Sequence, residues 1–203
     1  MDGYHFSRAQ LSAMPNPEEA HARRGAAFTF DGDAFLALVR QVREPLDVVP
    51  TMAAEAVAAT AREGGETGTA GVALCSSSSP PPSSQPLKRA TRVLYAPSFD
   101  HAVKDPVADD IAIAPTTRVL IFEGNYLGLD RPPWRDAARL MDELWFVEVG
   151  FDVAKARLVK RHVQAGIAAN EEEARKRVEE NDLVNGREIV DERLPMDEII
   201  ISQ

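Results

Sequence analysis

Unbroken apolar runs in the second half of the chain predict buried β-strands. Residues 119–122 read Val-Leu-Ile-Phe and end at Glu123-Gly124, an acid followed by the residue that tolerates almost any backbone angle. Residues 144–149 form a second run and residues 199–201 a third. Strands buried on both faces of a parallel sheet have continuous apolar sequences of this kind, so these runs are the expected strands of the sheet.

Apolar residues at helical spacing separate these strands. Positions 35, 38, 39 and 42 share one helical face, and Asp31 or Asp33 can cap that helix. Residues 92–97 predict a short strand, whereas residues 7–27 look irregular. Further helices are predicted over residues 136–143, over residues 152–165 (capped by Asp152 and ended by Gly166), and from Asn170 onward, where Glu173 completes a capping-box-like start. Strands that alternate with helices predict an α/β fold with a parallel sheet.

Composition narrows the classes of protein to consider. A chain of 203 residues with 44% hydrophobic residues is long enough for one domain with a core. Its net charge of −9 and the lack of a basic block argue against a nucleic-acid partner. No apolar run approaches the ~20 residues that span a bilayer, and the first residues carry no signal pattern, so we predict no membrane association and a cytoplasmic location. A single cysteine, Cys75, excludes a disulfide framework, and four scattered histidines disfavour a zinc site.

Residues 46–91 differ in composition from the rest of the chain. An Ala-rich piece leads into a series of glycines and then into a tract of serines and prolines. Such low-complexity sequence buries too little apolar surface to order itself. We therefore predict a disordered insertion within a single domain of residues 1–203, since loop-closure entropy grows only logarithmically with loop length. A regulatory or partner-binding segment is the alternative.

Two acids are candidates for catalysis. Asp2 and Glu123 can each end a strand of one sheet, and ligands gather at the carboxyl ends of such strands. Phosphoryl transfer uses a pair of this kind, one group to hold magnesium or its water and one to take the proton from an attacking hydroxyl. A strand that simply meets solvent at a charged residue explains each acid equally well.

Two polar stretches are candidates for binding. Arg157, Lys160 and Arg161 share one helical face, and this basic stripe could neutralise triphosphate charge or could be a solvated surface. The segment with Asp100, His101 and Lys104 could hold a polar substrate or could form a loop that caps nearby elements.

Several segments together resemble a known family, the P-loop kinases of the uridine kinase, phosphoribulokinase and pantothenate kinase superfamily. The similarity is greatest to the branch of nucleoside/nucleotide kinase family proteins. The matching segments are Met1-Asp2-Gly3-Tyr4-His5-Phe6, Arg24-Gly25-Ala26-Ala27-Phe28-Thr29-Phe30-Asp31, Tyr95-Ala96-Pro97-Ser98-Phe99-Asp100-His101-Ala102-Val103-Lys104-Asp105-Pro106, Val119-Leu120-Ile121-Phe122-Glu123-Gly124-Asn125-Tyr126 and residues 157–187. Their order and spacing make the match specific, although each piece alone would be weak.

The resemblance implies a role for each matching position. Asp2 matches an acid expected to act as general base or to bind the magnesium shell, and Glu123 matches an acid expected near magnesium. Residues 157–187 match a lid-like helical segment whose closure over ATP would exclude water. The segments that line the acceptor site in relatives match Tyr4, His5, Arg24, Asp33, Phe99, His101 and Lys104, and the approach to the lid matches Arg157 and Arg161. ATP and Mg²⁺ are therefore the expected cofactors.

One departure from the family pattern is severe. The nucleotide site of the family is G-x-x-x-x-G-K-S/T, whose backbone amides cradle the phosphates, and this motif is absent from the 203 residues. In the family this loop and its central strand precede the segment that matches Asp2. We therefore expect a P-loop NTPase-type sheet that is incomplete at its N-terminus, in which residues 119–122 and 144–149 flank a gap or pair with each other. Unpaired buried groups cost ~1–3 kcal/mol each against ~5–15 kcal/mol of total stability, so we predict a marginal, aggregation-prone chain that binds ATP poorly.

Three functional hypotheses follow. The first is an ATP-dependent kinase that transfers the γ-phosphate to a hydroxyl of a small polar metabolite, such as a nucleoside-, sugar- or pantothenate-like alcohol, and that is impaired for lack of a P-loop. The second is a non-catalytic remnant that binds a metabolite or a protein partner. The third is an unrelated α/β binding module, which would require Asp2 and Glu123 to lie far apart. We favour the kinase, and the sequence does not determine the oligomeric state.

Overall fold

The computed structural model describes residues 1–44 and 92–202. The predicted insertion over residues 46–91 and its Cys75 lie outside the described residues. In the part of the chain that the structure describes, no helix is both long and apolar enough to cross a membrane.

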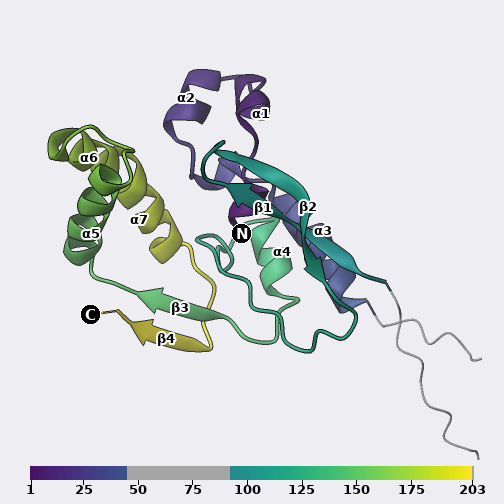
Figure 1. The fold of residues 1–203 in the computed structure, drawn as a ribbon. Coiled ribbons are helices and arrows are strands. Elements are labelled where there is room, and N and C mark those ends of the chain that lie inside the picture. The colour runs from purple at the N-terminus through teal and green to yellow at the C-terminus, as the bar shows by residue number, and fades with distance from the viewer. Residues whose placement is uncertain (45–91, 203) are drawn as a thin grey trace, which may run out of the picture. The chain divides into compact units, whose positions relative to one another are not determined.

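A pair of parallel strands confirms the α/β class. β3 (Trp145–Glu148) pairs in parallel with β4 (Glu198–Ile201), with Trp145 opposite Glu198 and Glu148 opposite Ile201 (Figure 1). Four helical elements lie between the two strands in sequence: α5 (Phe151–Gln164), α6 (Glu171–Arg177), the π-helix η3 (Val178–Asp182) and α7 (Leu183–Asp191). A parallel pair needs such a crossover connection, and both strands were predicted from their apolar runs.

The ends of the helices between β3 and β4 match the predicted ends in part. Gly150, not Asp152, is the N-cap of α5, so the predicted cap was wrong by two residues. Gly166 has a φ of +65° just after the helix, as expected for a residue that ends it. Asn170 caps α6 by accepting a hydrogen bond from the Glu173 backbone, as predicted.

An antiparallel hairpin forms where a single short strand and a polar loop were predicted. β1 (Leu94–Asp100) pairs with β2 (Asp105–Ile113), with an irregularity in the register between Ala96 and Ser98. Pro97 lies at this irregularity and has no N–H to donate to the ladder. The Asp100 carboxylate accepts hydrogen bonds from two backbone N–H groups of the following turn. These two bonds stabilise the turn that connects β1 and β2.

The predicted strand over residues 119–122 is not present. These residues belong to no strand, and Val119 and Ile121 are 76% and 89% exposed. They pair neither with β3 nor with any other described strand. A β-strand needs a partner for its backbone groups, and this apolar run has none in the described part of the chain, so the prediction of a buried strand was wrong.

The first 44 residues are more helical than their sequence suggested. They contain a short turn η1 (Asp2–Tyr4), α1 (Arg8–Ser12), α2 (Pro17–Ala22), a second turn η2 (Ala27–Thr29) and α3 (Gly32–Arg43). The prediction of an irregular stretch over residues 7–27 therefore missed α1 and α2. Both carry start signals that were overlooked: a capping box between Ser7 and Gln10, and Pro17 at the first helical position.

Aromatic side chains form the core between α3 and α4 (Trp134–Ala138). Asp31 caps α3 through the Ala34 backbone, which settles the choice between Asp31 and Asp33. The helix α4 begins earlier and ends earlier than the predicted range 136–143. The largest side chains of this cluster are Tyr4, Phe30, Phe35, Tyr126 and Trp134, with ring centroids 5.3–6.3 Å apart.

Candidate active site

The two predicted catalytic acids are brought to neighbouring backbone segments. The amino group of Met1 donates a hydrogen bond to the Glu123 carbonyl oxygen, and the Met1 side chain packs directly against Gly124. Asp2 and Glu123 are both exposed, and neither forms an ion pair with another described residue. The two acids therefore lie on adjoining backbone segments although 121 positions separate them in sequence.

The imidazole of His5 is held in one orientation by the Asp2 backbone and by two aromatic rings. Its ring lies 3.9 Å from the Phe30 ring and 5.1 Å from the Phe99 ring. Nδ1 is 2.8 Å from the Asp2 carbonyl oxygen, which can only accept, so Nδ1 carries the proton and Nε2 the lone pair in the neutral ring. Burial lowers the pKa of His5, so the neutral form is favoured.

Arg24 ties the hairpin turn to the N-terminal segment. Its guanidinium donates to the Phe6 carbonyl at 3.0 Å, to the Lys104 carbonyl at 2.7 Å and to an Asp105 carboxylate oxygen at 3.1 Å. The Arg8 backbone N–H donates to the same carboxylate oxygen at 2.9 Å, and this bond lowers the pKa of Asp105. These contacts fix the position of the turn after β1.

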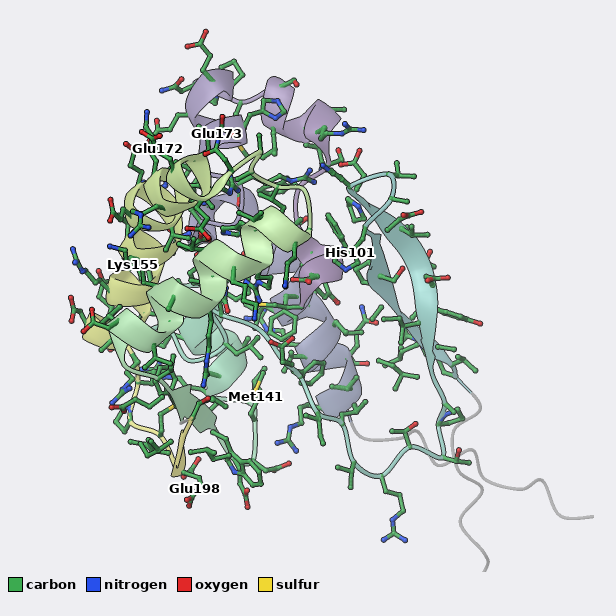
Figure 2. All side chains as sticks on the ribbon, turned by 60° about the vertical axis from the view of Figure 1, so that its left-hand side comes forward. His101, Met141, Lys155, Glu172, Glu173 and Glu198 are labelled. Carbon is green, nitrogen blue, oxygen red and sulfur yellow. The ribbon has the colours of Figure 1, made fainter. Side chains whose placement is uncertain are left out.

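Most of the predicted substrate residues gather around this turn. The Arg24 guanidinium lies 5.6 Å from the centre of the Phe99 ring, and the Phe99 and His101 rings are 5.2 Å apart. Figure 2 shows His101 at the turn between β1 and β2. Lys104 contributes its backbone carbonyl, and its φ of +63° forms the turn. His5, Arg24, Phe99, His101 and Lys104 are therefore parts of one cluster.

Two predicted substrate residues are placed differently. The Tyr4 side chain is buried against Phe35, and burial raises its pKa to about 12, so it stays protonated in the core. Asp33 is exposed in the first turn of α3 and forms no ion pair with a residue of the described part of the chain. A groove of about 430 Å³ runs beside these residues and is lined by His5, Tyr4, Asp31, Gln10, Tyr95 and Pro106 among others.

The predicted lid residues lie on α5. Arg157 donates to the Ser202 hydroxyl at 2.9 Å, and Arg161 is exposed. A separate hollow of about 610 Å³ between α5 and α6 is lined by Lys160 and Arg175, but not by Arg157 or Arg161. Of the predicted basic stripe, only Lys160 therefore lines this hollow, where it is joined by Arg175 and Lys155. Figure 2 shows Lys155, which also lines it, on α5, and Glu172 and Glu173 on α6.

A polar network that the sequence did not reveal lies beside the cluster. Tyr126, fully buried, donates its hydroxyl to the Gly25 carbonyl at 2.7 Å, and burial raises its pKa. Arg23 donates to the side chains of Asn181 and Asn185 at 2.9 Å each. The sequence signals were the Arg-Arg-Gly tripeptide and two asparagines four positions apart, which place both on one helical face.

The donor set allows only a lightly held metal ion. In the described ranges, no group of three or more His, Cys, Asp and Glu side chains could hold a metal. Magnesium is often bound by one or two carboxylates together with substrate phosphates, and Asp2 and Glu123 are exposed carboxylates of the right chemical type for that role.

Comparison with known proteins places the chain among kinases. No family model matches it. It is 44% identical to the ATP-dependent kinase-like protein notR' of Aspergillus versicolor, over 98% of this chain and 92% of that protein. It is 38% identical to the Schizosaccharomyces pombe protein named "Putative uridine kinase C227.14", over 100% of this chain and 67% of that protein.

A solved structure supports the same conclusion. YFH7 of Saccharomyces cerevisiae, described as "a putative P-loop containing kinase with a circular permutation", superposes with a TM-score of 0.70 at 26% identity. This chain is covered completely and spans 56% of YFH7. The sequence relatives and the structural neighbour agree on the kinase family, and the structural neighbour agrees with the α/β fold described above. The chain belongs to the family of ATP-dependent P-loop kinases.

Proposed function

We propose that this chain transfers the γ-phosphate of ATP to a hydroxyl group of a small polar metabolite. The observation that carries the proposal is the contact of Met1 with Glu123 and Gly124, which brings the backbone segment that bears Asp2 and the oriented His5 to the segment that bears Glu123. A small metabolite suits a groove of about 430 Å³, and the net charge of −9 disfavours nucleic acid. A cytoplasmic location is part of the same proposal.

The proposed reaction needs a base and a positioned acceptor. The acceptor hydroxyl gives its proton to the Asp2 carboxylate while its oxygen attacks the γ-phosphorus. The bond from the γ-phosphorus to the bridging oxygen breaks, and ADP leaves. The lone pair on His5 Nε2 can accept a hydrogen bond from a hydroxyl in the groove and so orient it. Magnesium, held by Glu123 and Asp2, would supply positive charge to the phosphates.

The lid-like segment of residues 157–187 is proposed to act on the nucleotide. Lys160 and Arg175 line the hollow between α5 and α6 and provide cations there for phosphate oxygens. No glycine-rich lysine loop occurs among the 203 residues, so these residues alone offer ATP no backbone cradle. We therefore propose weak ATP binding by this chain.

Removing the two acids tests the proposal. Asp2→Asn and Glu123→Gln keep the size of each side chain and remove its charge. We expect phosphorylated product, measured by mass spectrometry alongside ADP, to fall by ~10²-fold or more with either variant, the usual contribution of a general base. Asp110→Asn, at an exposed position of β2, is the matched control and should keep full activity. Unchanged turnover in Asp2→Asn and Glu123→Gln would overturn the proposal.

A second candidate is a non-catalytic protein that binds the same class of metabolite. It is favoured by the absence of a G-x-x-x-x-G-K-S/T motif from these 203 residues. Metabolite binding that persists in Asp2→Asn, without ADP formation by the unmodified chain, would support this second function.

A further inference from the structure

Arg23, the residue before Arg24, is hydrogen-bonded to two buried asparagines. Its Nε donates to Asn181 Oδ1 and its Nη2 to Asn185 Oδ1, both at 2.9 Å. Asn185 Nδ2 lies 3.4 Å from Asn181 Oδ1, and the two asparagines are only 6% and 4% exposed. A guanidinium has donors only, so both amide oxygens must face it, and its orientation is set on two edges.

Arg23 has no carboxylate partner among the described residues, whereas three other half-buried arginines each have one. Arg24, Arg135 and Arg193 each have a carboxylate oxygen nearby, at 3.1, 3.3 and 3.6 Å. Within residues 1–44 and 92–202, Arg23 has no ion pair. Asp182, which follows Asn181, lies instead 2.7 Å from His162 Nε2. Neutral amides orient a cation without cancelling its charge, so a partly buried guanidinium held in this way favours an anionic ligand.

The network joins the loop that carries the candidate substrate residues. Arg23 and Arg24 are consecutive, and Arg24 bonds to the hairpin turn. The Gly25 carbonyl accepts the Tyr126 hydroxyl at 2.7 Å, and Tyr126 follows Glu123 by three positions. The oriented charge of Arg23 thus belongs to the same stretch of backbone as the proposed acceptor site.

We propose that Arg23 binds a negatively charged group, a phosphate or a carboxylate, on the acceptor molecule, and that Asn181 and Asn185 hold the guanidinium in place for it. This inference rests on the proposed function and narrows it. The acceptor is then a hydroxyl compound that carries one anionic group, rather than a neutral nucleoside or sugar. Because both asparagines lie in the lid-like segment, the anion would bind where that segment meets the loop of residues 23–25.

Binding of matched pairs of compounds tests the proposal without any chemical step. Each pair differs by one anionic group: ribose 5-phosphate and ribose, uridine 5′-monophosphate and uridine, pantothenate and pantothenol. Calorimetry on the full chain, in the absence of ATP, measures the affinity ratio within each pair. We expect at least one charged member to bind ~10-fold or more tighter than its neutral partner, which corresponds to about 1.4 kcal/mol.

Variants then assign that preference to Arg23. Arg23→Gln should reduce the ratio to about one, and Arg23→Lys should keep part of it because the charge remains. Asn181→Asp keeps an oxygen acceptor for Nε but adds a carboxylate that neutralises the guanidinium, so it should retain the fold and lose the preference. Arg40→Gln, on the exposed side of α3, changes the net charge by the same amount and should leave the ratio unaltered.

The possible results separate the hypotheses. Arg23 could instead serve only to hold the helical segment with Asn181 and Asn185 in place. In that case Asn181→Asp will bind the charged and neutral members of each pair with the same affinity ratio as the parent chain, and the proposal is overturned. Equal affinity within every pair, or no binding of any charged member, also overturns it. A loss of ATP affinity in Arg23→Gln without a change in these ratios would assign the anion to the nucleotide, against the proposal. If the chain transfers no phosphate but still binds the charged member of a pair more tightly, the kinase function is refuted and the anion site is supported.

Discussion

His5 is constrained on several sides, and its protonation is coupled to folding. Two aromatic rings flank it and its Nδ1 is tied to the Asp2 carbonyl. Burial lowers its pKa in the folded protein, so acid favours the unfolded state, in which the ring takes up a proton more readily. The stability that this residue confers is present above its ordinary pKa and is lost as the pH falls below it.

A comparison of two pH values tests this coupling. His5→Asn keeps a donor near the position of Nδ1 and removes the titration. Between pH 7.5 and pH 5.5, we expect the free energy of unfolding in urea to fall more for the parent chain than for His5→Asn. Equal losses in the two proteins would show that the folded ring titrates as it does in the unfolded chain.

At the scale of elements, the first residues of the chain are packed against the hairpin without room for a side chain. A Cβ added at Gly3 would collide with the Pro97 carbonyl oxygen, which is backbone and cannot swing away. The neighbouring residues Asp2 and His5 owe their positions to this close approach. A larger residue at position 3 must therefore displace either η1 or β1.

Alanine at position 3 should disturb both stability and the site. We expect Gly3→Ala to destabilise the fold by ~1–3 kcal/mol, the usual cost of overpacking, and to weaken metabolite binding. Gly150→Ala is the matched control, because a Cβ there meets nothing within 4 Å and should change the stability little. Thermal unfolding of both variants decides the matter, and equal midpoints would contradict the packing described for Gly3.

The elements also show what the sequence could predict. The apolar runs gave β3 and β4 correctly, because each is a short run with a parallel partner in the same chain. The run at residues 119–122 has the same character and yet forms no strand, because strand formation depends on a partner that a local pattern cannot supply. The strand β2 was missed because its acidic pair, Asp109 and Asp110, interrupts the apolar pattern.

The site was predictable to a similar extent. His5, Arg24, Phe99, His101 and Lys104 gather as expected, since the family resemblance set their order along the chain. The hydrogen bonds of Arg23 to Asn181 and Asn185 were not foreseen, because these partners lie 158 and 162 positions away. Contacts over such separations arise only from the tertiary fold.

At the scale of the whole molecule, the described surface carries much exposed apolar area on its parallel strands. Trp145 and Val147 are 63% and 60% exposed, and Ile200, opposite Val147, is 43% exposed. Exposed apolar strands favour association with other chains. We therefore expect the predicted aggregation to take place through the strands β3 and β4.

Polar substitutions on that surface should make the protein more soluble. We expect the pair Val147→Thr and Ile200→Thr, which keeps β-branching, to reduce concentration-dependent association in light scattering. The matched control is Val103→Thr with Ile111→Thr on the hairpin, where the side chains are 55% and 50% exposed. An equal effect of both pairs would mean that the strands β3 and β4 are not the site of association.

The most direct test of the kinase account is calorimetric titration of Mg²⁺–ATP. One protein is this chain alone, and the other is this chain lengthened at its N-terminus by a strand, a G-x-x-x-x-G-K-S/T loop and a helix from a P-loop kinase. We predict binding only by the lengthened protein, weakened by Glu123→Gln. Tight binding by the unmodified chain would contradict the importance of the missing loop, and binding by neither protein would contradict the kinase itself.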